Sequence, residues 1–161
     1  MRPLALSRFH RVVLTIGIWG VSVLIAPAAG AQTLTLTVSP STITFAAADP
    51  DTTPSIAASS ITVSYRVRNN AAGSWRISLL ASGDLTAGSA TIPITNVTWT
   101  ASPTPRFQAG TLSRTLAQTL ASGSGNVQNT TTGTVVFRLA NSWTYNVGSY
   151  STSVVFTLTA P

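Results

Sequence analysis

The stretch that decides the fold runs from Ser60 to Asn69 and reads Ser-Ile-Thr-Val-Ser-Tyr-Arg-Val-Arg-Asn. Apolar side chains occupy every second position from Ile61 to Val67, and polar side chains occupy the positions between them. Successive side chains of a β-strand point to opposite faces of its sheet. The alternation therefore predicts a strand with one buried face and one face in solvent.

The same period of two recurs along the rest of the chain. It predicts further strands over residues 34–38, 42–45, 74–80, 92–100, 133–140 and 149–159. A short Asn/Ala/Gly linker separates the run 74–80 from the run 60–69, so we expect these two strands to form a hairpin. Pro93 predicts that the strand over 92–100 starts at a sheet edge.

One segment fits two structures, and the remaining segments look like loops. Leucines at 112, 116 and 120 would line one face of a helix, but the threonine content of 112–120 favours an extended segment. Residues 46–59, 101–110, 121–132 and 141–148 are rich in Pro, Gly, Asn or Ser and are predicted as loops. We therefore expect an all-β protein, an antiparallel immunoglobulin-like β-sandwich of about 7–9 strands, with a small closed barrel as the alternative.

The N-terminus has the order of a secretory signal peptide. Three arginines come first, an uncharged apolar run follows from Val12 to Ile25, and the small residues Ala29-Gly30-Ala31 end it. We expect cleavage before Gln32, with residues 1–31 as the signal and 32–161 as one domain. The alternative is an uncleaved membrane anchor, although the apolar run is shorter than the roughly 20 residues that a bilayer span needs.

The residue types after the signal argue against catalysis. The 161-residue chain has no Cys, Lys or Glu, and its one His is His10. Acid–base catalysis usually needs a group that titrates near neutral pH, and a Ser or Thr nucleophile needs a base beside it. Transition metals prefer His and Cys ligands. We expect a protein that is not an enzyme and that uses no cofactor and no metal.

Arginines on strands are the first candidate binding residues. Arg66, Arg68, Arg76 and Arg138 all fall on outward positions of predicted strands. If those strands share a sheet, their guanidinium groups form a basic stripe that matches the paired oxygens of phosphate or carboxylate. The alternative is ordinary solvated strand faces. The predicted mature part carries six arginines against three aspartates, a net charge of +3, which is too little to favour nucleic acid as a partner.

Aromatic residues in a loop are the second candidate. Trp75 and Trp99 alternate with aliphatic residues and are expected in the core, whereas Trp143 and Tyr145 lie in the predicted loop 141–148. Loop aromatics can stack on sugars or anchor an interface. Alternatively, Trp143 closes one end of the sandwich.

Two stretches resemble known families of secreted bacterial surface domains. Residues 70–77, Asn-Ala-Ala-Gly-Ser-Trp-Arg-Ile, resemble the first tryptophan motif of WxL-type domains, and residues 150–161 resemble their closing motif, with Phe156 where that family has Trp. Gly148-Ser149-Tyr150 is similar to the lead into the last strand of fimbrial and spore-coat-U-like subunits, which commonly carry a Cys pair that is absent here. The resemblance implies a cell-envelope β-sandwich and transfers no binding residue.

These observations predict an exported envelope or cell-surface protein with a structural or adhesive role. Its expected partner is an anionic envelope polymer, a glycan or another surface protein, and we expect no transmembrane segment after signal cleavage. The alternative is a subunit of a secreted filament that self-associates by strand addition, with the uncharged segment Thr33–Val38 as the donor strand.

Overall fold

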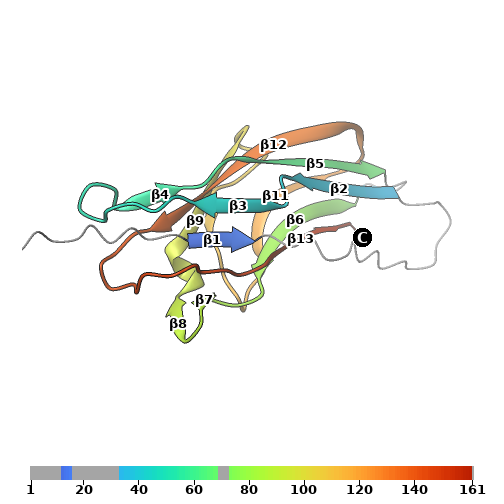
Figure 1. The fold of residues 1–161 in the computed structure, drawn as a ribbon. Coiled ribbons are helices and arrows are strands. Elements are labelled where there is room, and N and C mark those ends of the chain that lie inside the picture. The colour runs from blue at the N-terminus through green and yellow to red at the C-terminus, as the bar shows by residue number, and fades with distance from the viewer. Residues whose placement is uncertain (1–11, 16–32, 69–72, 161) are drawn as a thin grey trace, which may run out of the picture.

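The chain folds into two antiparallel β-sheets that pack face to face (Figure 1). This computed structural model describes residues 12–15, 33–68 and 73–160, which form thirteen strands and one 3-10 helix. The strands are β1 (Val12–Thr15), β2 (Thr33–Ser39), β3 (Thr42–Phe45), β4 (Ser55–Ala57), β5 (Ile61–Arg68), β6 (Ser74–Ala81), β7 (Leu85–Ala87), β8 (Ala90–Ile92), β9 (Val97–Ser102), β10 (Gly110–Thr111), β11 (Gln118–Ser124), β12 (Val127–Ala140) and β13 (Val154–Thr159), with the 3-10 helix η1 (Ile94–Asn96) before β9.

The larger sheet has the strand order β10-β9-β12-β5-β2, with β4 added beside β12. The smaller sheet has the order β11-β6-β13. Two more antiparallel pairs, β7 with β8 and β1 with β3, lie outside these sheets. The all-β antiparallel sandwich predicted from the alternating runs is confirmed, and the strands form two separate sheets rather than a closed barrel.

The core lies between the inner faces of the two sheets. All four apolar positions of β5 from Ile61 to Val67 are at most 1% exposed, as the alternation predicted. The rings of Tyr65 and Trp75 meet across the sheets with their centroids 4.8 Å apart. Trp75 and Trp99 are both in the core, which confirms the prediction for them.

The predicted hairpin of residues 60–69 and 74–80 is wrong. Both segments are strands, but β5 pairs with β2 and β12 in the larger sheet, whereas β6 pairs with β11 and β13 in the smaller one. The connection crosses from one sheet to the other, and residues 69–72 of it lie outside the described residues. A short linker fits a hairpin and a crossover equally well, so the sequence alone could not separate them.

Two of the predicted loops contain strands. Strand β4 lies inside the predicted loop 46–59 and pairs with β12. The predicted loop 121–132 holds the end of β11 and the start of β12, which meet at a turn containing Gly125. Residues 112–120 contain no helix, but they are not one extended segment either, because a bend at 114–116 precedes the start of β11. Leu112 and Leu120 are buried while Leu116 is 66% exposed, so the three leucines share no face.

Two predicted strands are shorter than expected. The segment 92–100 divides into the end of β8, the helix η1 and the start of β9, and β9 lies between β10 and β12, so Pro93 does not place it at an edge. In 149–159 the regular strand starts at Val154, although Tyr150 and Thr152 are buried as predicted.

Only four residues of the predicted signal peptide are described. Val12–Thr15 form β1, which pairs with β3 from Val12 opposite Phe45 to Thr15 opposite Thr42. The rest of 1–31 lies outside the described residues. No helix in the described part of the chain is long and apolar enough to cross a membrane.

Candidate functional site

The predicted arginines point outward but do not form one stripe. Arg68, Arg76 and Arg138 are exposed and Arg66 is half-exposed. Arg76 belongs to the smaller sheet, so it cannot share a face with the others. Arg138 lies opposite Ala57 and Thr98, well beyond the position where β12 meets the start of β5. The stripe prediction is therefore wrong. The period of two determines which side chains point outward, but it does not determine the order of the strands in the sheets.

The strand registers instead gather charge at the two ends of the sandwich. Arg66 and Arg68 end β5, and Arg76 lies near the start of β6, where the rings of Tyr65 and Trp75 join the two sheets. Arg106 reaches the same end, because it contacts Thr131 opposite Tyr65. We call the end that carries the side chains of Arg66, Arg68 and Arg106 the arginine end.

The acidic side chains lie at the other end. Asp49 and Asp51 are in the loop between β3 and β4, and Asp84 follows β6. Arg114 and Arg138 are also at this end, so its side chains sum to about −1, against +3 from Arg66, Arg68 and Arg106 at the arginine end. We call it the aspartate end.

Backbone carbonyls hold two of these arginines, and the guanidinium of Arg76 reaches along β6 away from the arginine end, because Ala117 precedes the residue opposite Leu79. The Nε of Arg66 donates to the carbonyl oxygen of Gln128 at 2.7 Å, and the Nη2 of Arg76 donates to that of Ala117 at 2.7 Å. A guanidinium has five N–H donors. Each of these bonds occupies one donor, and it orients the group without neutralising its charge.

The two predicted aromatic residues lie at the aspartate end and face different ways. Trp143 is 53% exposed, and its indole Nε1 donates to Asp51 Oδ1 at 2.9 Å. Tyr145 packs against the core, its hydroxyl accepts from Asn96 Nδ2 at 2.8 Å, and burial raises its pKa. The two rings therefore form no shared platform, and each joins the loop 141–148 to another segment.

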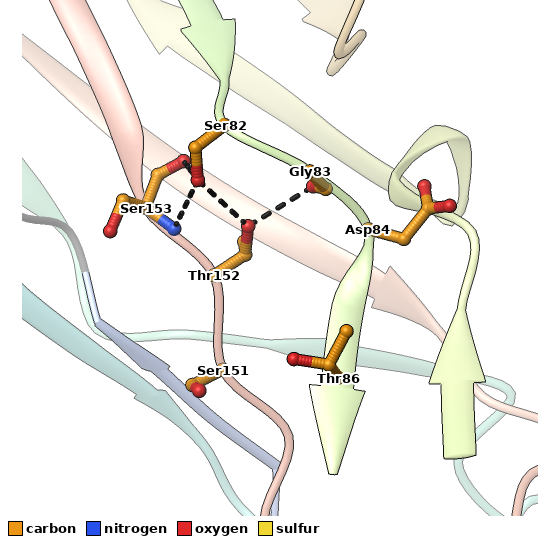
Figure 2. A pocket seen from close by; sticks show the side chains of 7 residues that line it. All are labelled: Ser82, Gly83, Asp84, Thr86, Ser151, Thr152 and Ser153. Carbon is orange, nitrogen blue, oxygen red and sulfur yellow. Dashed lines mark hydrogen bonds between the residues drawn. The ribbon is translucent and has the colours of Figure 1, made fainter. Parts of the chain in front are cut away.

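A polar pocket of about 550 Å³ opens at the aspartate end (Figure 2). Sequence reasoning did not identify it, because its two walls are 70 residues apart. Thr152 donates from Oγ1 to the carbonyl oxygen of Gly83 at 3.0 Å, and the Ser82 hydroxyl donates to the carbonyl oxygen of Ser153 at 3.2 Å. The Ser82 and Thr152 hydroxyls are thus engaged with the chain itself, and Asp84 is the one carboxylate among the lining residues.

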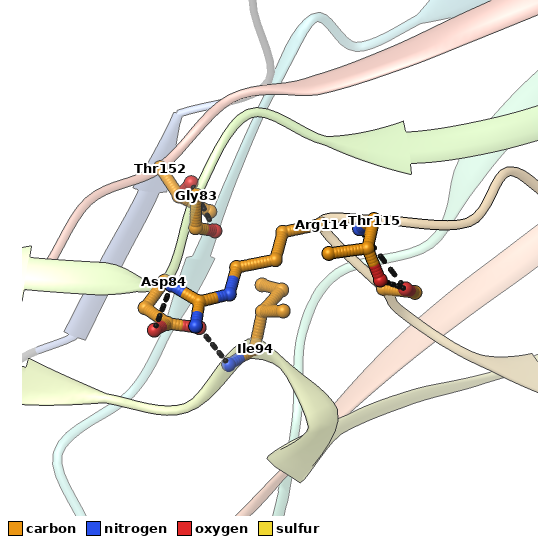
Figure 3. Close-up of polar contacts among 7 residues, drawn as sticks. Gly83, Asp84, Ile94, Arg114, Thr115 and Thr152 are labelled. Atoms are coloured by element: carbon orange, nitrogen blue, oxygen red, sulfur yellow. Dashed lines mark hydrogen bonds and ion pairs between the residues drawn. The ribbon is translucent and has the colours of Figure 1, made fainter.

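The carboxylate beside this pocket has a structural role (Figure 3). Asp84 Oδ1 accepts the backbone N–H of Ile94 at 2.9 Å, and Oδ2 lies 3.0 Å from Arg114 Nη1. Both oxygens are thus occupied, and the carboxylate fixes the turn after β6 to the start of η1. Asp84 is poorly placed to act as a base for the neighbouring serines.

A second pocket, of about 480 Å³, opens at the arginine end. Its lining includes Trp75, Arg106, Gly123 and Asn126. Arg106 is exposed, and its Nη1 lies 3.5 Å from Thr131 Oγ1. The sequence analysis missed this pocket, because Arg106 lies in a proline-rich loop and the 121–124 segment was predicted as another loop.

Within the described residues, no group of three or more His, Cys, Asp or Glu side chains could hold a metal ion. Comparison with protein-family models and with curated protein sequences gives no match for this chain.

Proposed function

We propose that this chain is exported by its N-terminal leader and acts outside the cytoplasm as a non-enzymatic β-sandwich that holds an anionic envelope polymer. The leader follows the order of a signal peptide, from arginines through an apolar run to Ala29-Gly30-Ala31. Mass spectrometry of the released protein tests export directly, since the expected chain starts at Gln32.

The separation of charge is the observation that carries the binding role. The side chains of Arg66, Arg68 and Arg106 lie at one end of the sandwich, and the three aspartates lie at the other. A cluster of one sign raises the local concentration of oppositely charged ligands and steers their approach. The arginine end would then meet the polymer, while the aspartate end faces away from it.

The absence of a base supports the non-enzymatic part of the proposal. Residues 33–160 contain many hydroxyls but no His, Cys, Lys or Glu. The one carboxylate beside the hydroxyl pocket, Asp84, is engaged with Ile94 and Arg114. A serine without a base is a weak nucleophile.

A pull-down on immobilised polyuronate, with neutral dextran as the control resin, tests the binding role. We expect retention on the polyuronate only, with a steep loss as salt rises from about 50 to 300 mM, because the ion pairs are screened. The single variants Arg68→Ser and Arg138→Ser form a matched pair, since both side chains are exposed on strands of the larger sheet.

Arg68→Ser should weaken retention, and the double variant Arg66→Ser/Arg68→Ser should weaken it further. Arg138→Ser, at the aspartate end, should leave retention almost unchanged. Equal loss in both single variants would show that net charge alone drives binding, which contradicts a role for the arginine end.

A filament subunit is the second candidate, and one observation favours it. Here β13 is the last described strand, and among the described strands it pairs only with β6. Its outer edge therefore offers unpaired backbone groups to an added strand.

The predicted donor segment is already in use within the chain. All seven residues of β2, which include Thr33–Val38, pair with β5. Strand donation would require β2 to leave its own sheet. Size-exclusion chromatography with light scattering separates the two functions: large species that survive detergent support the filament, and a monomer contradicts it.

A further inference from the structure

The pocket at the arginine end contains a hydrogen-bond donor that has no acceptor. The side chain of Trp75 is 4% exposed, and its indole Nε1 is fully buried without a hydrogen-bond partner. A buried polar atom without a partner costs about 1–3 kcal/mol and calls for an explanation. The other core tryptophan shows the contrast, because Trp99 Nε1 donates to the carbonyl oxygen of Gln108 at 2.8 Å.

The indole that carries the unpaired N–H forms part of the pocket wall. Trp75 and Gly123 face each other across β6 and β11, and both line the pocket. A Cβ on Gly123 would come within 3.1 Å of Nε1 and within 2.5 Å of the indole ring. The absence of a Cβ on Gly123 therefore lets the indole ring lie directly on the backbone of β11, at the wall of the pocket.

Arg106 supplies a positive charge at the same pocket. Its side chain is exposed, and its one described hydrogen bond, to Thr131, is long at 3.5 Å. It also lies near the hydroxyl of Tyr65, which makes no hydrogen bond of standard geometry. No carboxylate is among the lining residues of this pocket. Trp and Arg side chains are donors only, so both of these groups can bind an acceptor oxygen that a ligand brings.

We propose that this pocket binds the oxyanion of an acidic saccharide, with Arg106 on the charged oxygens and the Trp75 N–H as a second donor. A guanidinium prefers paired oxygens with negative charge, and a ligand oxygen would satisfy the unpaired indole. The inference rests on the proposed function in that it names the group of the polymer which the arginine end would recognise. A carboxylate sugar and a phosphate-bearing sugar share this chemistry.

The test is an NMR titration of the purified, ¹⁵N-labelled protein with glucuronate, with glycerol phosphate and with neutral glucose. Indole N–H signals are few, and Trp75→Phe identifies the one of interest by removing it. We expect a saturable shift of the Trp75 indole signal with glucuronate or glycerol phosphate, and the tighter of the two identifies the class. Glucose should cause no shift.

Two variants that each remove one guanidinium make the titration decisive. Arg106→Gln should weaken oxyanion binding roughly ten-fold or more, as the loss of a charged hydrogen bond predicts. Arg138→Gln, at the opposite end, should stay within about two-fold. Both side chains are exposed, so neither substitution should disturb the packing of the core.

Three results would overturn the inference: no saturable shift with either anion, an equal response to glucose, or unchanged affinity in Arg106→Gln. The first result would leave bound water as the partner of the indole N–H. If Arg106→Gln still binds polyuronate in a salt-sensitive and Arg68-dependent way, only the pocket fails and the proposed function stands. If polyuronate binding is absent while the titration succeeds, the pocket stands without the polymer role.

Discussion

At the scale of single residues, two buried tyrosines provide a matched test of what a hydroxyl contributes. Tyr150 donates to the carbonyl oxygen of Asn146 at 2.8 Å, whereas the hydroxyl of Tyr65 lies near Arg106 and Thr131 but makes no hydrogen bond of standard geometry. Tyr150→Phe should lower the free energy of unfolding by about 1 kcal/mol, and Tyr65→Phe should be close to neutral at pH 7. Urea unfolding of the two variants measures both values. An equal loss in both would mean that the Tyr65 hydroxyl has a partner in solution.

The burial of Tyr65 also predicts how the stability of the protein changes at alkaline pH. Burial raises the pKa of Tyr65, and the nearby Arg106 opposes this shift only in part. The folded state therefore keeps the phenol neutral longer than the unfolded state does. Its contribution is complete below about pH 10 and is lost as the pH rises toward the raised pKa. Tyr65→Phe should accordingly lose less stability above pH 10 than the parent does.

At the scale of strands, three glycines lie under aromatic rings. Gly110 contacts Trp99, Gly123 contacts Trp75, and Gly133 contacts Phe107, in each case with a ring atom within 2.6 Å of where a Cβ would stand. Gly133→Ala should therefore lower the free energy of unfolding by roughly 1–3 kcal/mol through overpacking. Gly83→Ala is the control, because nothing lies within 4 Å of its Cβ position. Thermal unfolding compares the two, and equal Tm values would contradict tight ring packing on Gly133.

These contacts also explain which elements the sequence could predict. The strands with clean alternation, such as β5 and β6, were found almost to the residue, because burial of one face is a local property of a strand. Gly123 and its Ser and Asn neighbours were predicted as loop because glycine usually ends a strand. Here the glycine makes room for an indole from β6, and that requirement comes from a segment 48 residues away.

At the scale of the whole molecule, the arrangement of the candidate site followed from strand order rather than from periodicity. The outward direction of Arg68 and Arg138 was predictable, but their separation to opposite ends depends on how β4, β5 and β12 align. Arg106 was not predictable as a site residue, because only the packing of its loop against Thr131 brings it beside Trp75. Pairing between distant strands carries this information, and no local pattern contains it.

The composition of the whole molecule gives the last prediction, which concerns pH. Residues 33–160 contain no His and no Cys, so no side chain of the domain ordinarily titrates between about pH 5.5 and 9. Because the slope of stability with pH equals the difference in bound protons between the unfolded and folded states, that slope should be near zero in this range. Urea unfolding at steps of half a pH unit should therefore give a constant free energy of unfolding across this range. The free energy should fall above about pH 10, because burial raises the pKa values of Tyr65 and Tyr145 in the folded state and both phenols ionise first in the unfolded chain. The comparison is the unprocessed chain, which still carries His10. In both forms the α-amino group is the remaining group that titrates in this range. A clear change of stability near pH 6.5 in the processed protein would contradict the prediction, since it would require a titrating side chain that the domain does not contain.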